Sequence, residues 1–364
     1  MNKLKCAGLC ACLLWLCVGQ QLGAQTETVR LMTYNVENLF DLSDNPLTAD
    51  DEFLPTGAYA WDSLRYRGKL AHLSRAMLAA GGTTPVDLVG LCEVENATVL
   101  RDLTEHSRMA RLGYRFVITH SRDRRGVNVA LLYQPERFMP VSVDTLRIAY
   151  DAQREHPTRD VLHVAGRLLT GDTLDVIVGH WPSRRGGAGR TEAYRCRTAA
   201  RIRALADSLC RTRANAAVVI MGDFNDEPNN KSVRQVLGAA PPTPPTDQGH
   251  RAGEDTEPAP YVNLSANLTD DALGVRGTYK YQSHWNRLDH IIVNQALLHH
   301  PRLSVSPDAC RILTYPFLLE READSWEGVQ PHRTYRGPRY LGGTSDHLPL
   351  LLQISVREPL RPSP

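Results

Sequence analysis

The sequence lacks the short motifs that mark several common catalytic sites. It has no Cys-x-x-Cys pair and no His-Glu-x-x-His motif, which argues against cysteine-based and protease-type zinc sites. Gly-x-Ser-x-Gly and Gly-x-x-x-x-Gly-Lys-Ser/Thr motifs are also missing, so acyl-hydrolase and P-loop functions lose support. No repeat with a period of about 20 to 50 residues occurs, which argues against solenoid and propeller folds.

Residues 1–24 have the composition of a secretory signal peptide. The basic stretch MNKLK precedes an apolar run from Cys6 to Val18, and small residues allow cleavage after Ala24. We therefore expect an exported protein, periplasmic or extracellular, whose mature chain of residues 25–364 does not insert stably into a membrane. The alternative is an uncleaved membrane anchor, although the apolar run is shorter than the roughly 20 residues that span a bilayer.

Cysteines are scarce once this leader is removed. Four of the eight lie in residues 1–24, which leaves Cys92, Cys196, Cys210 and Cys310. In an oxidising compartment these thiols allow up to two disulfide bonds, and the sequence does not choose among the possible pairings.

The mature chain also lacks a surplus of positive charge. The full sequence has 42 Lys and Arg residues against 40 Asp and Glu residues, and removing Lys3 and Lys5 leaves 40 of each sign. A protein that binds nucleic acid by broad charge attraction usually has a basic surplus. If this protein binds nucleic acid, the binding must rest on a local basic patch.

Hydrophobic periodicity and turn signals predict more strands than helices. Helices are expected at 63–80, 97–112, 190–212 and 231–237. Strands are expected at 30–34, 88–92, 115–119, 127–133, 161–169, 174–179, 216–221, 288–293 and 348–354. Because strands and helices do not alternate strictly, we expect a single α/β domain with two packed sheets and helices outside. The Pro-rich stretch 239–260 is expected to be a surface insertion in this domain.

Polar residues stand at one end of six predicted strands. Four strands end at Asn35, at Glu93, at His180, and at Asp223 and Asn225, and two begin at Asp289 and at Asp346 and His347. If the last two strands run opposite to the first four, all of these residues meet at one rim. We therefore expect a shared site there, with antiparallel neighbours in the sheets.

The side chains at this rim suit hydrolysis of a phosphate ester. Oxygen donors such as Glu93, Asp223 and Asp346 favour Mg²⁺, with Mn²⁺ or Ca²⁺ as alternatives. A divalent ion neutralises charge on the phosphoryl oxygens, a carboxylate orients water, and a histidine protonates the leaving oxygen. The sequence therefore predicts a metal-dependent phosphoesterase.

Two arginine-containing loops lie where they can help to bind the substrate. HWPSRRGG carries Arg184 and Arg185 after His180, and SRDRRGVN carries Arg125 before Asn128. Because guanidinium groups bind phosphate oxygens in pairs of hydrogen bonds, we expect these three arginines and Asn128 to bind the substrate phosphate. The alternative for each arginine is a solvated surface charge.

The motifs, taken together, resemble the endonuclease/exonuclease/phosphatase superfamily, which includes pancreatic-type DNases, exonuclease III-like repair enzymes, inositol polyphosphate 5-phosphatases and bacterial sphingomyelinases. MTYNVENLF, GLCEVEN, VNVALLY, GHWPSRRGG, MGDFNDEP, RLDHIIV and TSDHLPLL occur in that order across nearly the whole mature chain. The resemblance implies a DNase I-like four-layered α/β sandwich with the site at one end of two packed sheets.

The resemblance also implies roles on the metal side of the site. Glu93 would be the main Mg²⁺ ligand, with Asn35 beside it. Asp346 would complete the metal or nucleophile side.

For proton transfer and phosphate binding, the resemblance implies a second set of roles. Asp223 would orient and deprotonate the attacking water, and Asn225 would hold the phosphate or that water. His347 would contact a phosphate oxygen and be polarised by Asp289. His180 matches the histidine that acts as the leaving-group acid in the DNase-like branch.

Three neighbouring polar residues are expected to be structural. His290 follows Asp289 directly on a strand and so faces the opposite way, which favours packing or support of the site. Asp226 and Glu227 are expected to be loop or capping residues.

The choice of branch favours a nuclease. Ile220 replaces a Trp of the 5-phosphatases, and HWNRLDHI lacks their Cys-Asp-Arg element. Trp181, Trp285 and Trp326 offer no apolar tip for a sphingomyelinase-like membrane contact, and export separates the chain from chromosomal repair. We expect a monomeric nuclease acting on DNA or RNA, with no protein partner. The alternatives are a phosphatase or phospholipase C-like hydrolase of small phosphoesters or lipid head groups, and a non-catalytic binding protein of the same fold.

Overall fold

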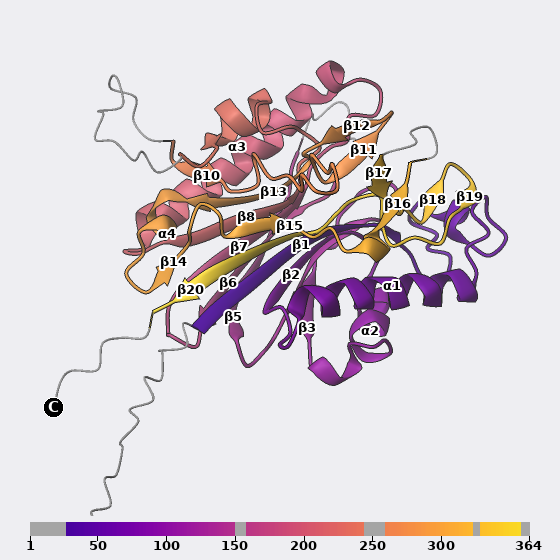
Figure 1. Ribbon diagram of the computed structural model, residues 1–364, viewed down its shortest axis with the longest axis horizontal. Coiled ribbons are helices and arrows are strands. Elements are labelled where there is room, and N and C mark those ends of the chain that lie inside the picture. The colour runs from indigo at the N-terminus through magenta and orange to yellow at the C-terminus, as the bar shows by residue number, and fades with distance from the viewer. Residues whose placement is uncertain (1–26, 150–157, 244–258, 323–327, 358–364) are drawn as a thin grey trace, which may run out of the picture.

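Two large β-sheets pack face to face, and helices cover their outer faces (Figure 1). The structure, a computed structural model, describes residues 27–149, 158–243, 259–322 and 328–357. The predicted signal peptide 1–24 lies outside these residues, as does most of the Pro-rich insertion. The four layers confirm the fold class expected from the sequence.

Each sheet has a parallel pair of strands between antiparallel neighbours. The first sheet has the order β14-β20-β1-β2-β4-β3, with β15 paired to β20. Its strands are β1 (Glu27–Leu39), β2 (Leu88–Val94), β3 (Arg115–Ile118), β4 (Asn128–Tyr133), β14 (Leu303–Ser304), β15 (Cys310–Ile312) and β20 (Leu350–Val356). The second sheet has the order β5-β6-β7-β8-β13-β10-β9. Its strands are β5 (Phe138–Leu146), β6 (Val161–Leu168), β7 (Thr173–His180), β8 (Ala217–Asp223), β9 (Ala239–Ala240), β10 (Tyr261–Asn263) and β13 (Asp289–Asn294).

The helices lie on the outer faces of the two sheets. α1 (Ser63–Gly81) and α2 (Ala97–Glu105) cover the first sheet, and α3 (Ala188–Thr212) covers the second. The shorter helices are α4 (Gln295–Leu298), a π-helical turn at Ser232–Leu237, and 3₁₀ turns at Asp51–Phe53, Ala110–Leu112 and Pro316–Leu318. None of the helices in the described part of the chain has the length and hydrophobicity that crossing a bilayer needs.

Three small hairpins complete the fold. They are β11 (Tyr279–Tyr281) with β12 (His284–Asn286), β16 (Leu319–Arg321) with β17 (Val329–Pro331), and β18 (Tyr335–Arg336) with β19 (Arg339–Tyr340). The first of them lies beside the polar edge of the sheets and lines the cavity described below.

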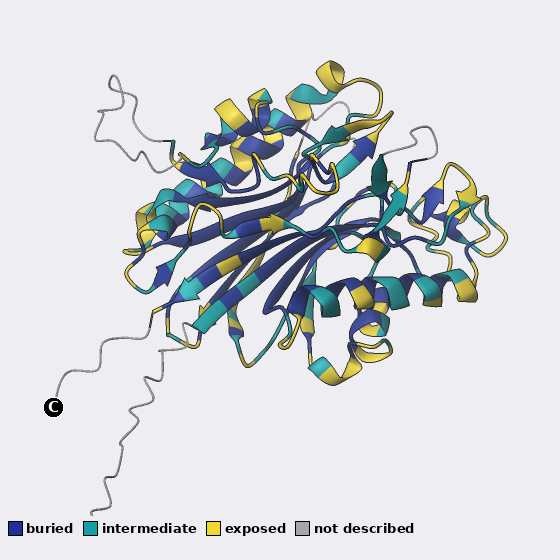
Figure 2. Cartoon of the chain, in the orientation of Figure 1, coloured by how far each residue is buried: buried dark blue, intermediate teal, exposed yellow. Residues whose placement is uncertain are grey.

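The layered core explains why some strands are apolar on both faces. In β8, Val219 and Met221 pack between the sheets, whereas Val218 and Ile220 pack under α3. Successive side chains of a strand point to opposite faces, so a strand covered on both sides needs a continuous apolar run. Figure 2 shows the central strands of both sheets as almost wholly buried.

All nine predicted strands are present, with ends shifted by a few residues. The prediction missed β5, an edge strand whose Met139, Val141 and Val143 are about half exposed. The expected helix at 97–112 ends at Glu105, because the Ser107 hydroxyl bonds the backbone and competes with the helix.

Two further expectations have structural outcomes. Ala239–Ala240, at the start of the expected loop 239–260, form β9, which pairs in parallel with β10 just after the loop; residues 244–258 of the loop lie outside the described residues. Cys92, Cys196, Cys210 and Cys310 are all free, so neither of the disulfide bonds that the sequence allows is formed.

Candidate active site

The polar strand ends meet at one edge of the two sheets, as the sequence predicts. β1 and β2 are parallel, and so are β7 and β8, whereas β20 and β13 run antiparallel to β1 and β8. His180 and Asp289 are the register partners of Asp223 on its two neighbouring strands. Because β1 and β2 also contact β7 and β8 across the sandwich, both sheets deliver their polar ends to one place.

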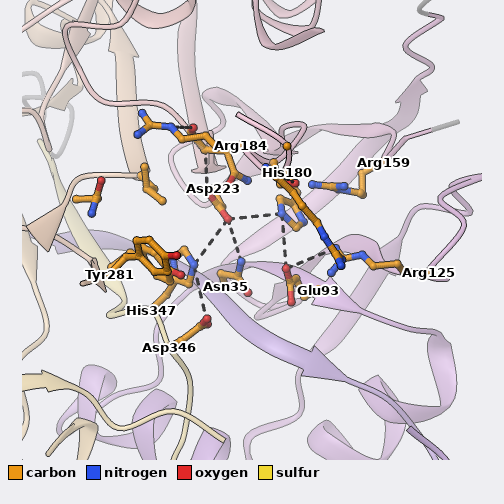
Figure 3. Close-up of a pocket in the computed structure, with 17 residues that line it drawn as sticks. Asn35, Glu93, Arg125, Arg159, His180, Arg184, Asp223, Tyr281, Asp346 and His347 are labelled. Carbon is orange, nitrogen blue, oxygen red and sulfur yellow. Dashed lines mark hydrogen bonds and ion pairs between the residues drawn. The ribbon is translucent and has the colours of Figure 1, made fainter. Parts of the chain in front are cut away.

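A cavity of about 800 Å³ opens at this edge (Figure 3). It is lined by ten of the predicted site residues: Asn35, Glu93, Arg125, His180, Arg184, Arg185, Asp223, Asn225, Asp346 and His347. Asp289 lies behind His347, and Asn128 lies elsewhere. Arg159, Tyr279, Tyr281 and Asn286 also line the cavity, and the sequence analysis did not identify them.

Glu93 enters the cavity from a β-bulge in β2. The register of β2 against β4 shifts between Cys92 and Val94, which leaves Glu93 as an extra residue. Its φ of 67° is left-handed, a conformation that costs energy in a non-glycine residue and that often occurs at functional sites. The Asn38 backbone N–H donates to its Oε2 at 3.0 Å. The bulge thus re-aims the carboxylate toward the space between the sheets.

The surroundings of Glu93 keep it ionised. Burial raises the pKa of this carboxyl, but the charges of Arg125 and Arg159 outweigh that effect and hold it below its usual value. Its Oε1 lies 3.6 Å from Arg125 and 3.7 Å from His180, which is beyond ordinary hydrogen-bond distance. One carboxylate oxygen therefore faces the cavity without a close donor.

Asp223 is fixed at the end of β8 by the residues before and after it. Gly222 has a φ of 135°, and a Cβ there would lie 1.9 Å from the Gly179 carbonyl oxygen, so only glycine fits. The carboxylate accepts the Asn225 backbone N–H at 2.9 Å and the Asn35 side-chain amide at 3.0 Å. Burial raises the pKa of Asp223 to about 7, which suits a general base at neutral pH.

His347 is polarised from behind by Asp289. Its Nδ1–H donates to the Asp289 carboxylate at 2.7 Å, and its Nε2 lies 3.9 Å from Asp223 and 4.0 Å from Asp346. Burial lowers the pKa of His347, but Asp289 and Asp223 together raise it well above its usual value. The ring is therefore an imidazolium at neutral pH and can donate to a phosphate oxygen.

His180 faces the same carboxylate in the opposite charge state. Its Nε2 lies 3.5 Å from Asp223, and its Nδ1 has no hydrogen-bond partner among the described residues. Burial, with Arg159 and Arg125 nearby, lowers the pKa of His180 well below its usual value. A neutral imidazole accepts a proton more readily than it donates one, and the expected role of His180 as leaving-group acid stays a prediction.

The two predicted arginines of the 181–187 loop differ in how much of their hydrogen-bonding capacity is free. Arg184 donates to the Asn225 carbonyl oxygen and to the Asn230 side chain, both at 2.7 Å. Its guanidinium therefore mainly holds the loop that carries Asn225. Arg185 is exposed at the cavity and remains available to an anionic substrate.

A second pair of arginines lies on the other side of the cavity. Asp123 lies 3.8 Å from Arg125 and 3.3 Å from Arg159, so it pairs with both guanidinium groups. Arg159 is 7% exposed, donates to the Trp181 carbonyl oxygen, and has an Nε–H without a partner among the described residues. No motif pointed to Arg159, because it precedes β6 without a recognisable pattern.

Asn128 requires a correction. Its amide donates to the Glu95 carbonyl oxygen at 2.7 Å, and its side-chain oxygen accepts the Ser121 backbone N–H at 2.7 Å. These bonds occupy the side chain in closing the loop before β4, and Asn128 does not line the cavity. The predicted contact with the substrate phosphate is therefore not supported.

A buried hydrogen-bond network around Lys69 supports the segment that carries Asp346 and His347. Lys69 of α1 is 1% exposed and donates to the Thr344 carbonyl oxygen at 2.7 Å, the Glu37 carbonyl oxygen at 3.1 Å and the Thr334 hydroxyl at 2.5 Å. The Glu37 carboxylate accepts the Thr334 and Tyr335 backbone N–H groups. No sequence pattern indicates this network, since its partners lie far apart along the chain.

The residues expected to be structural behave in that way. His290 is buried, contacts the Asn263 side chain and the Asp226 carbonyl oxygen, and packs on Phe224. The Asp226 carboxylate pairs with Arg195 at 2.7 Å. None of these residues lines the cavity.

The donor set fits a divalent cation held by oxygen. Atoms of Asp223, Asp289 and His347 lie within 4.8 Å of one another. The hydrogen bond between His347 and Asp289 occupies that pair, which leaves the carboxylates that face the cavity as the oxygen donors. Asp289 Oδ1 is buried without a hydrogen-bond partner among the described residues, and Glu93 has an oxygen free to face the cavity. Carboxylates in this number suit Mg²⁺, Mn²⁺ or Ca²⁺ better than a thiolate-binding metal.

Comparison with known proteins agrees with this geometry. A family model described as "Endonuclease/Exonuclease/phosphatase family" matches residues 30–356. No curated protein sequence is similar enough to the chain to match it.

Several solved structures share the fold at low sequence identity. An endonuclease/exonuclease/phosphatase family protein from Bacteroides thetaiotaomicron is 16% identical with a TM-score of 0.53, and the match covers 92% of this chain and 100% of that one. TDP2 from D. rerio, solved with a single-strand DNA product, is 15% identical with a TM-score of 0.53, covering 90% and 99%. The human Nocturnin catalytic domain, solved with a sulfate anion, is 16% identical with a TM-score of 0.50, covering 92% and 98%. At these identities the likeness supports the fold alone.

Proposed function

Because the chain belongs to the endonuclease/exonuclease/phosphatase family and is thus a phosphoester hydrolase, we propose that it is an exported Mg²⁺-dependent phosphodiesterase that cleaves DNA or RNA. The observation that carries this proposal is the grouping of three differently charged side chains around one cavity. They are an ionised Glu93, an Asp223 that titrates near neutral pH, and an imidazolium at His347.

Glu93, Asn35 and Asp346 are the residues that would hold the cation. When bound, Mg²⁺ would neutralise negative charge on the phosphoryl oxygens. The free oxygen of Glu93 and the low pKa of its carboxyl support this assignment. Asn35 also fixes Asp223 through its amide, so the metal side and the nucleophile side share one residue.

Asp223 is proposed to orient the attacking water and take its proton. The backbone of Asn225 and the amide of Asn35 hold both carboxylate oxygens in place. His347, kept cationic by Asp289, would donate to a non-bridging phosphate oxygen. Fixed donors and a poised base lower the barrier because they need no rearrangement as charge develops.

The arginines at the cavity support a polyanionic substrate. The mature chain has no overall basic surplus, so nucleic acid must be held by a local patch. Arg125, Arg159 and Arg185 all line the cavity. Because Arg125 and Arg159 also pair with Asp123, the exposed Arg185 is the guanidinium most available to the substrate. TDP2, which has the same fold, was solved with a single-strand DNA product, which is consistent with this choice of substrate.

Export and a monomeric state are also part of the proposal. The basic stretch, apolar run and small residues of 1–24 support a cleaved leader. Fractionation of cells that express the full chain should find residues 25–364 outside the cytoplasm.

The direct test compares the mature protein with Asp223→Asn on DNA, RNA, bis-(p-nitrophenyl) phosphate, sphingomyelin and inositol phosphates. We expect Mg²⁺-dependent cleavage of DNA or RNA that stops in EDTA. The substitution keeps the shape of the side chain but removes the base, so the rate should fall at least about 100-fold.

Asp308→Asn is the control for this test, because Asp308 is exposed and does not line the cavity. It should retain full activity. Full nuclease activity in Asp223→Asn would refute the assignment of the site. Release of phosphate or phosphocholine with intact DNA and RNA would instead show that the substrate class is wrong.

A further inference from the structure

One tyrosine at the cavity is both large and exposed. The structure leaves several large apolar or aromatic side chains exposed, and among the described residues Tyr281 is the one of these that also lines the cavity. It is 58% exposed. Exposed side chains of this kind at the rim of a site often contact a ligand. Tyr281 is therefore a candidate contact for the substrate.

The hairpin of β11 and β12 aims Tyr281 at the cavity. Tyr279 and Tyr281 are two residues apart on β11, so both point to one face of the hairpin. Tyr279 packs against the His347 ring with centroids 4.9 Å apart. Tyr281 lies one step further from the catalytic residues, about 7 Å along the strand. The Tyr281 ring is thus about one nucleotide unit further along the hairpin than the Tyr279 ring that contacts His347.

The back of the hairpin is anchored firmly. Lys280, which points the other way, forms a buried ion pair with Glu322 at 2.7 Å and lies over the Trp285 ring. Ser283 in the turn donates to the same Glu322 at 2.6 Å. Gln282 and Ser283 both have positive φ, as in a tight two-residue hairpin turn. A rigid support of this kind presents Tyr281 in one orientation.

The cavity is chemically asymmetric about Asp223. Figure 3 shows Arg125 and Arg159 on one side of the carboxylate and Tyr281 on the other. A phosphodiester has two substituents. One side of this site favours further negative charge, and the other offers a flat aromatic surface. A nucleic acid strand has both features, since phosphates alternate with planar bases.

From this arrangement we propose that Tyr281 stacks on the base next to the scissile phosphate and thereby favours single-stranded nucleic acid. Stacking on an aromatic side chain tolerates any base, because every base has a π-face. A base paired inside a duplex is already stacked on its neighbours and would have to leave them. This inference rests on the proposed nuclease function and names how the same site binds its substrate.

The test uses a short single-stranded oligonucleotide and a series in which a stable abasic analogue replaces each nucleotide in turn. The wild-type protein should lose affinity at one position beside the cut and little elsewhere. Tyr281→Ala should raise KM about 5- to 150-fold on the intact strand with a much smaller effect on kcat. It should also be insensitive to the abasic position that affects the wild type.

Matched variants separate stacking from damage to the hairpin. Tyr281→Phe and Tyr281→Trp keep the π-face and should bind like the wild type. His284 is the cross-strand partner of Tyr281; it is exposed and does not line the cavity. His284→Ala should therefore leave KM unchanged.

The inference fails if Tyr281→Ala and the wild type respond alike to the abasic series, or if the wild type shows no sensitive position. A wild-type protein that cuts no oligonucleotide but hydrolyses other phosphoesters would overturn the nuclease function and the stacking role together.

Discussion

Two histidines that face one carboxylate differ in charge because of what stands behind them. Asp289 sits behind His347 and raises its pKa, whereas burial beside Arg159 lowers that of His180. Pairs of titratable groups whose environments push their pKa values apart are typical of acid–base sites. A motif match assigns the residue type at each position, but the charge state depends on these neighbours.

His290 shows the same principle in a purely structural setting. The Asn263 side-chain oxygen accepts from Ser265, so its amide N–H must donate to His290 Nδ1 at 2.9 Å. The other ring nitrogen donates to the Asp226 carbonyl oxygen. The neutral ring satisfies both contacts, and a proton on Nδ1 would meet a donor. Burial accordingly lowers the pKa of His290 to about 4.

This environment predicts an effect of pH on stability. An unfolded histidine titrates near 6.5, so between about pH 6.5 and 4 the unfolded chain binds more protons than the native one. The stability that His290 contributes is therefore present above pH 6.5 and is lost as the pH falls toward 4. We expect His290→Leu to destabilise the protein more at pH 7 than at pH 5, by about 2 kcal/mol. Urea unfolding at the two pH values measures this difference.

The exposed His299 supplies the control. His299→Leu should change the free energy of unfolding by a similar small amount at both pH values. A His290→Leu penalty that does not shrink in acid would contradict the neutral-ring geometry.

At the level of single residues, a site residue could be predicted when it has a catalytic residue type and stands at the end of a recognisable strand. Asp223 and Glu93 could be placed because each follows an apolar run and strand ends gather at one edge. Arg159 could not, since its position depends on a salt bridge to Asp123, which lies far from it in the sequence. The predicted role of Asn128 was wrong because an amide side chain beside an arginine-rich loop can hydrogen-bond the protein backbone as readily as it can bind a substrate.

At the scale of elements, a single helix side chain connects three segments of the site. Lys69 of α1 joins the end of β1 to the segments at Thr334 and Thr344. Asp346 and His347 lie two and three residues after Thr344, and Asn35 lies two residues before Glu37. Through the Lys69 ammonium group, α1 therefore holds the end of β1, which carries Asn35, at a fixed distance from the segment that carries Asp346 and His347.

We expect Lys69→Met to lower both stability and activity. The methionine fills the space but leaves the Glu37 and Thr344 carbonyl oxygens and the Thr334 hydroxyl without their donor. Each buried polar group left without a partner costs about 1 to 3 kcal/mol. Thermal unfolding and kcat on the nucleic acid substrate both report the change, and kcat should fall because Asp346 and His347 shift.

Arg67→Met on the same helix is the comparison, because Arg67 is exposed. Its effect should stay within about 0.5 kcal/mol. If Lys69→Met were as stable and active as Arg67→Met, the connecting role of Lys69 would be excluded.

The elements that the sequence did not predict have one property in common. The strands of the two sheets were recognisable because burial on one or both faces requires regular apolar patterns. β5 lies at an edge with an exposed face, and β11 and β12 are three residues each. Partners distant in the chain hold such elements in place, so their own sequence carries little periodic signal.

At the scale of the whole molecule, the proposed cation would lie where the two sheets meet. Its proposed ligands Glu93 and Asn35 come from the first sheet, and Asp223 at the end of β8 in the second sheet lies beside Asn35. The carboxylates repel one another across this junction when no cation is bound. Binding to the native state alone raises stability in proportion to the logarithm of ligand concentration.

We expect Mg²⁺ at about 100 times its Kd to raise Tm by about 5 °C. Glu93→Gln should lose most of that shift, because the main ligand becomes neutral. The exposed Glu136 gives the control, and Glu136→Gln should keep the full shift. An equal Mg²⁺ effect in all three proteins would mean that the ion acts elsewhere. Scanning calorimetry measures this without reference to any substrate.

The parallel pair in each sheet has a wider consequence. β1 and β2 are connected through α1, and β7 and β8 are connected through α3, each between antiparallel neighbours. The molecule thus consists of two halves with similar connectivity, and the cavity lies at the seam between them. Their contributions differ, because Glu93 and Asp346 stand on one half and Asp223 and Asp289 on the other. The two halves are similar in connectivity, but each carries different catalytic residues. Neither half alone could therefore contain a complete site.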